Sequence, residues 1–141
     1  LWIFGSQLEP GLGRIRFVTL YLLCGIAGCA ASYAFSPPSQ GSLGASGAVF
    51  GLVGAALVIG RRLSWDMSMA ATFLMLSLVI GFMSARIDWR AHLGGLVAGL
   101  ALGAVFAYAP TRLRNPLHIG AAAAVLVVVI VIAGWRTAAL S

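Results

Sequence analysis

A serine and a histidine lie at corresponding places in two apolar segments of this sequence. Ser46 lies between Gly44 and Gly47 in the run GASGAVFGLVGA, and His92 opens the run HLGGLVAGLALG. A serine hydroxyl becomes an effective nucleophile when a base removes its proton, and a neutral histidine can act as that base near pH 7. The pair therefore suggests nucleophilic catalysis. A serine among small residues is also common in membrane helices as a packing residue, so that alternative stays open at this point.

Composition indicates which kind of chain must position these two residues. Hydrophobic residues make up 61% of the 141 positions, charged residues only 9%, and the mean hydropathy is +1.02. A soluble domain carries about 25% charged residues. The five longest apolar stretches each approach the roughly 20 residues that cross a bilayer. They cover about 17–35, 43–60, 67–84, 91–109 and 119–135.

We therefore expect an all-α polytopic membrane protein with about five transmembrane helices in one domain, 1–141. The opening LWIFG looks like the end of an earlier apolar span, so we expect this domain to be N-terminally incomplete. Cys24 and Cys29 are five residues apart on one predicted helix, about 140° around its axis, and are expected to be packing residues and not a disulfide. The sequence gives no reason to expect a metal or a cofactor.

The charge pattern indicates an orientation in the membrane. The net charge is +6, and all nine basic residues are arginines. Nearly all lie between the apolar stretches, which favours a lipid bilayer and not nucleic acid as the partner. Alternate connections carry six arginines on one side (14, 16, 61, 62, 112 and 114) and three on the other (86, 90 and 136). The positive-inside rule assigns the six to the cytoplasm. Ser46 and His92 then lie in the first turns of two parallel spans near the outer face, whereas His118 lies at the cytoplasmic end.

Small residues predict how these two spans approach each other. Glycines recur on one face of each predicted helix, at 47, 51 and 54 in the first and at 95, 99 and 103 after His92 in the second. Stripes of small residues let membrane helices pack closely. If the stripe with Gly47 and Gly51 packs against the stripe with Gly95 and Gly99, the hydroxyl and the imidazole come within reach of each other.

Two further features of this region suit a catalytic serine. Backbone amides at a helix N-terminus lack intrahelical partners, so those around Gly44, Ala45 and Gly47 can stabilise an oxyanion. Phe50, one turn after Ser46, is predicted to pack beneath the imidazole. Asp88, four residues before His92, lies between Arg86 and Arg90, and we expect it to form a solvated ion pair and not the third member of a triad.

The same residues resemble a known family. GASGAVFG is similar to the Gly-x-Ser-Gly nucleophile motif of the rhomboid intramembrane serine proteases, and AHLGGLVAGLALG resembles their histidine helix. LWIFGSQLEPGLGRIRFVTLYLLCGIAG also looks like the family's junction between its second and third spans. The two motifs occur in the family's order, two spans apart, and the likeness extends through Tyr108. This chain then supplies the third to the sixth spans of a rhomboid-like bundle and a seventh.

The resemblance implies a Ser46–His92 dyad that hydrolyses peptide bonds in or near the transmembrane helices of other proteins. By motif position, Gly44 helps to shape the oxyanion site, Phe50 packs against the histidine, and Gly95 and Gly99 are close-packing glycines. The family's first two spans, with further oxyanion donors, would lie before Leu1. We expect the active site to face the outside. Because the chain has nine arginines and no lysine, as GC-rich genomes favour, we expect a bacterial cell membrane.

Two alternatives remain. The first is a catalytically inactive rhomboid-like protein that binds transmembrane clients; the presence of both Ser46 and His92 argues against it. The second is a transporter or channel, which glycine-interrupted helices would suggest. The sequence has no internal repeat and no acidic residue inside a span to bind a coupling ion, since Asp66 and Asp88 lie at span edges.

Overall fold

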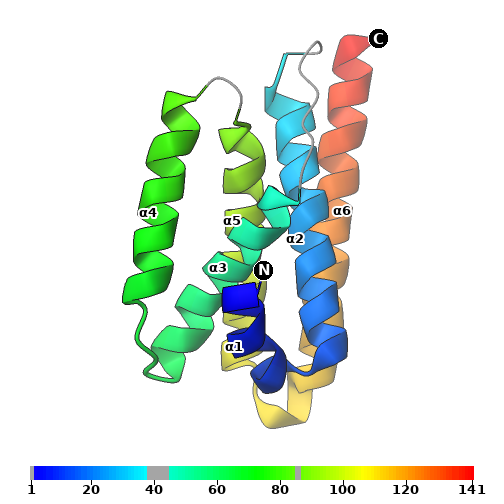
Figure 1. The fold of residues 1–141 in the computed structure, drawn as a ribbon. Coiled ribbons are helices and arrows are strands. Elements are labelled where there is room, and N and C mark those ends of the chain that lie inside the picture. The colour runs from blue at the N-terminus through cyan, green and yellow to red at the C-terminus, as the bar shows by residue number, and fades with distance from the viewer. Residues whose placement is uncertain (1, 38–44, 85–86) are drawn as a thin grey trace.

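The computed structural model describes residues 2–37, 45–84 and 87–141, which form six α-helices and one short 3₁₀ helix. They are α1 (Trp2–Leu12), α2 (Arg14–Phe35), α3 (Ser46–Arg62), α4 (Ser68–Met83), α5 (Trp89–Tyr108), η1 (Thr111–Leu113) and α6 (Arg114–Leu140). Figure 1 shows α4 on one side of the bundle and α6 on the other, with α3 and α5 between them. These described residues contain no strand, so the prediction of an all-α bundle is confirmed.

Local chemistry sets where several helices begin and end. Gly13 separates α1 from α2 with a φ of 82°, a backbone conformation that favours glycine. The carboxylate of Asp88 accepts hydrogen bonds from the first backbone amides of α5. Arg61 and Arg62 occupy the last turn of α3, where cations interact favourably with the helix dipole.

The helices differ sharply in how much of their surface the protein itself covers. α3 has 11 buried residues out of 17 and packs most extensively against α5 and α2. α4 buries only Ala70 and Gly81, and α6 buries only His118. α3 is therefore the central helix, and α4 and α6 present their apolar side chains outward.

Helices α2 to α6 overlap the five predicted spans, with ends that differ by a few residues; positions 43 and 44 lie outside the described residues. Three segments are long and apolar enough to cross a membrane: Arg14–Phe35, Trp89–Tyr108 and Thr111–Leu140. The helix Ser68–Met83 is apolar but shorter, and the central α3 has only 17 residues. A helix enclosed by protein need not reach both membrane surfaces, because its neighbours and not lipid surround its ends.

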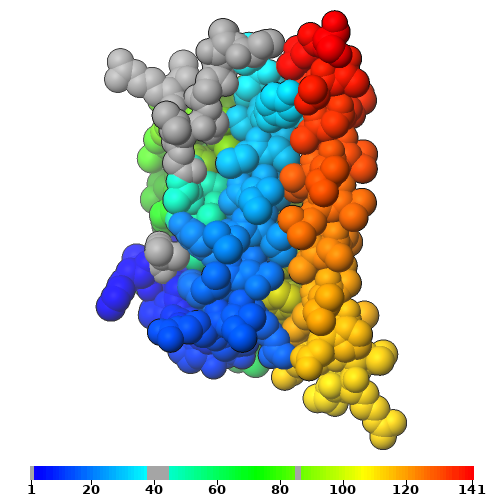
Figure 2. All heavy atoms as spheres, turned by 90° about the vertical axis from the view of Figure 1, so that its right-hand side faces the viewer, coloured from blue at the N-terminus to red at the C-terminus, as the bar shows by residue number. Residues whose placement is uncertain are grey.

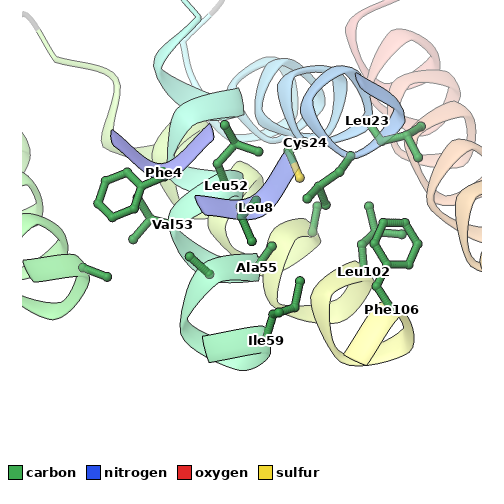
Figure 3. Close-up of a cluster of buried hydrophobic side chains, with 14 residues drawn as sticks. Phe4, Leu8, Leu23, Cys24, Leu52, Val53, Ala55, Ile59, Leu102 and Phe106 are labelled. Atoms are coloured by element: carbon green, nitrogen blue, oxygen red, sulfur yellow. The ribbon is translucent and has the colours of Figure 1, made fainter. Parts of the chain in front are cut away.

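A hydrophobic core joins α1, α2, α3 and α5 (Figure 3). Its largest fully buried side chains are Leu8, Leu20, Leu52, Leu102, Val53 and Cys24. Both cysteines are free, as their angular separation predicts. Cys24 is a buried packing residue, whereas Cys29 is exposed, so the packing role predicted for Cys29 is wrong.

Candidate active site

Ser46 and His92 line the same cavity. Ser46 is the first residue of α3, and His92 lies in the first turn of α5. The cavity measures about 300 Å³ and is formed by the first turns of α3 and α5 together with α4. Its other lining residues are Val49 and Phe50 from α3, Phe73, Ser77 and Ile80 from α4, and Ile87. The site is therefore a mostly apolar chamber with two hydroxyls and one imidazole.

The imidazole is held by an aromatic ring. Phe50 and His92 stack with their ring centroids 4.1 Å apart and an interplanar angle of 8°. Both side chains are buried, with exposed fractions of 3% and 7%. Nδ1 of His92 is enclosed and has no hydrogen-bond partner among the described residues, and it points toward Gly81 of α4. Phe50 thus fixes the plane of the ring, and α4 covers one of its edges.

The glycine stripes of α3 and α5 lie in direct backbone contact. A Cβ atom built on Gly95 would overlap the carbonyl oxygen of Gly47, and one built on Gly99 would overlap that of Gly51. A Cβ on Gly47 would also come within 3.1 Å of the Ala91 carbonyl oxygen. The two helices can approach this closely only because these positions carry no side chain. This approach brings the first turn of α3 beside the first turn of α5.

Ser46 has an exposed position at the start of α3. Ser46 and Ala45 are exposed, whereas Gly47 is buried. Ala45 precedes α3, and its carbonyl accepts a hydrogen bond from Val49, so the amides of the first turn have no intrahelical acceptor. Gly44 lies outside the described residues. Within the described residues no hydrogen bond joins Ser46 to His92; such bonds often tighten only when substrate binds.

Asp88 does not have the solvated position that the sequence predicts. Its carboxylate is partly buried and accepts hydrogen bonds from the amides of Arg90 and Ala91, at 3.1 and 3.2 Å. It also accepts a short hydrogen bond from the hydroxyl of Ser32 in α2. Asp88 therefore caps the helix that carries His92 and links it to α2. Of its two expected partners, Arg86 lies outside the described residues, and the guanidinium of Arg90 lies over the Trp89 ring.

Sequence reasoning did not single out two serines. Ser77 in α4 lines the cavity beside Ser46, and Ser32 binds Asp88. Each is a single polar residue inside an apolar stretch, and this is the one feature of the sequence that could have identified it as a candidate. Among the described residues, no group of three or more His, Cys, Asp or Glu side chains could hold a metal ion.

Comparison with known proteins decides the family. The family model of the Rhomboid domain matches residues 1–109. The chain belongs to the rhomboid family. The matched segment contains both Ser46 and His92 and ends one residue after α5. Together with the apolar helices, it identifies an integral membrane protein.

Curated relatives support the same assignment. The chain is 36% identical over 104 residues to rhomboid protease GluP of Bacillus subtilis, covering 70% of this chain and 20% of that protein. It is 34% identical over 110 residues to the putative rhomboid protease YdcA of the same organism, covering 72% and 54%. It is also 36% identical over 120 residues to RHOMBOID-like protein 5 of Arabidopsis thaliana, covering 78% and 38%. The chain thus spans about half or less of each relative, and no solved structure matches it significantly.

Proposed function

We propose that this rhomboid protein is an intramembrane serine endopeptidase in which Ser46 is the nucleophile and His92 the general base. One observation carries the proposal: an accessible hydroxyl and a ring-stacked imidazole from two different helices line one cavity. A nucleophile and a base gathered in this way are the parts that acyl transfer needs. Relatives named rhomboid proteases give independent support.

The reaction follows from these positions. Ser46 Oγ attacks the carbonyl carbon of the substrate peptide bond while the His92 imidazole takes its proton. The tetrahedral intermediate collapses, the C–N bond breaks, and the imidazolium gives its proton to the leaving amine. A water molecule, deprotonated by His92, then attacks the acyl-enzyme and releases the second product with Ser46 restored. The exposure of Ser46 supports such access for water.

Charge on the intermediate needs stabilisation, and the start of α3 can provide it. The amides of Ala45 to Gly47 lie at a helix N-terminus, where backbone N–H groups and the helix dipole favour a negative charge. The absence of a side chain on Gly47 lets a substrate backbone come close. A donor of this kind contributes about 10² to 10³ in rate.

The proposed substrates are transmembrane segments of other proteins. The walls of the cavity other than Ser46, Ser77 and His92 are apolar, which suits a segment drawn from a membrane helix. The arginines at the opposite end of the bundle favour an orientation with this cavity toward the outer face of a bacterial cell membrane. Ser46 would then meet its substrates near the outer surface.

The test is covalent labelling of the full-length protein in membranes with a fluorophosphonate probe. We expect labelling of the wild type and none of Ser46→Ala or His92→Ala. Ser77→Ala is the matched control, since it removes the other hydroxyl of the same cavity and should leave labelling intact. An unlabelled wild type with Ser46 accessible to topology probes would refute the protease proposal and favour the inactive, client-binding alternative.

A further inference from the structure

A second cavity lies at the opposite end of the bundle from Ser46 and His92. It measures about 590 Å³ and is bordered by the starts of α2 and α6 and by Phe106 of α5. In Figure 2 these two helices run side by side, and part of α5, in yellow, is visible between them near the lower end. The polar residues of its lining are Arg14, Arg16, Thr19, Asn115 and His118. Nothing in the proposed peptidase chemistry uses this cavity.

The imidazole of His118 forms part of the wall of this cavity. The residue is 7% exposed, and its ring packs against Phe106 with centroids 4.4 Å apart. Neither ring nitrogen makes a hydrogen bond of good geometry in the described part of the chain, and the nearby Val105 carbonyl is at most a weak partner. Because both nitrogens are enclosed, the ring contributes its carbon atoms to the lining and shapes the cavity beside the arginines.

Two arginines give the cavity a positive charge. The guanidinium of Arg16 donates to Oδ1 of Asn115 at 2.9 Å and so bridges α2 and α6. Arg14 lies 3.7 Å from Glu9, in a pair whose side chains are 89% and 45% exposed, so water weakens their attraction. Arg114, one residue before Asn115, adds a further positive charge at this end. Glu9 is the one carboxylate described here beside these three arginines, so the cavity keeps a net positive charge that favours an anionic ligand.

The remaining walls are apolar. Ile15 and Ile119 flank the opening with exposed fractions of 84% and 70%, and Phe106 lies behind them. A free inorganic anion would gain nothing from these side chains. A phospholipid would, since its glycerol and upper acyl chains can cover them while its phosphate meets the arginines.

We propose that this cavity binds the headgroup of an anionic phospholipid. The phosphate accepts charge-assisted hydrogen bonds from Arg14 and Arg16. Basic pockets between transmembrane helices on the arginine-rich side of a membrane protein commonly hold such headgroups. The bound lipid would join α2 to α6, which are linked here by the hydrogen bond between Arg16 and Asn115. The proposal is independent of the peptidase chemistry, and either can fail without the other.

The test is native mass spectrometry of the full-length protein in a neutral detergent, with phosphatidylglycerol as the probe. We expect retention of phosphatidylglycerol and little retention of phosphatidylcholine. Arg16→Gln should weaken retention by about fivefold or more, the effect of one arginine at an anionic lipid surface. Arg112→Gln is the matched control, because it removes one positive charge at the same end from a residue outside the cavity lining.

A second variant separates the shape of the cavity wall from its charge. His118→Phe keeps an aromatic ring against Phe106 and removes two enclosed nitrogens, so it should fold well and retain phosphatidylglycerol as the wild type does. Three results would overturn the proposal: equal retention of the two lipids, equal loss in Arg16→Gln and Arg112→Gln, or displacement of the lipid by millimolar inorganic phosphate. The last result would identify a site for free phosphate.

Discussion

Gly95→Ala tests whether the close approach of α3 and α5 positions the proposed dyad. Gly95 lies one turn after His92 on α5 and faces the backbone of Gly47, the residue after Ser46. The substitution adds one methyl group and removes no proposed catalytic group. A lower labelling rate would therefore come from displaced groups and not from a missing one.

The structure gives the size of the disturbance. A Cβ on Gly95 would lie 2.6 Å from the carbonyl carbon of Gly47 and 3.0 Å from its Cα. Ordinary carbon contacts are about 3.5 to 4.0 Å, so the helices must separate by about 1 Å at this level. Overpacking of this kind costs about 1 to 3 kcal/mol of stability. A misplacement of about 1 Å between reacting groups costs about 10² in rate.

The assay combines two measurements on the full-length protein: unfolding by denaturant followed by circular dichroism, and the rate of fluorophosphonate labelling. We expect Gly95→Ala to lower both. Gly120→Ala on α6 is the matched control, because no atom lies within 4 Å of its added Cβ. That control should gain about 0.5 to 1 kcal/mol from helix propensity and label normally. If Gly95→Ala had the stability and the labelling rate of the wild type, the reasoning would be refuted. If it lost stability but kept its labelling rate, the glycine stripe of α5 would have a structural role only.

Two further predictions concern carboxylates at helix starts. Ser32→Ala removes a hydrogen bond to the partly buried carboxylate of Asp88, so the free energy of unfolding should fall by about 1.5 to 3 kcal/mol, measured by denaturant titration; no change would show that this bond stabilises nothing. Hydrogen bonds from Ser68 lower the pKa of Asp66, which lies in the connection before α4. Because the folded pKa lies below the unfolded value, the stabilising effect is present above about pH 4 and is lost as the pH falls through the folded pKa. Hydrogen exchange in the first turn of α4 should therefore speed up at low pH relative to the intrinsic exchange rate, and Asp66→Asn should remove this dependence.

The fold class and the shared location of Ser46 and His92 at one cavity could be predicted because the signals are local and periodic. Glycines at helical spacing mark a face where backbones meet, and the structure shows Gly95 against Gly47 and Gly99 against Gly51. The catalytic roles of these residues stay predictions. The position of Asp88 could not be predicted, because its partner Ser32 lies 56 residues away in the chain. The neighbouring arginines suggested a solvated ion pair for Asp88. In the structure its carboxylate is instead partly buried and accepts a hydrogen bond from a hydroxyl on a distant helix.

Hydrophobicity also could not tell which helices lie inside the bundle. Of the three candidate spans, the segment containing α6 is the most apolar and the least buried by protein, whereas the less apolar α5 is half buried. In a membrane this order has a physical reason: lipid tails are as apolar as a protein core, so burial gives leucine or valine little advantage. Interior helices are distinguished by small residues that let backbones touch, as in α3 and α5. The residues that reveal the interior of this bundle are thus its glycines, and the same glycines let α3 and α5 approach so that Ser46 and His92 line one cavity.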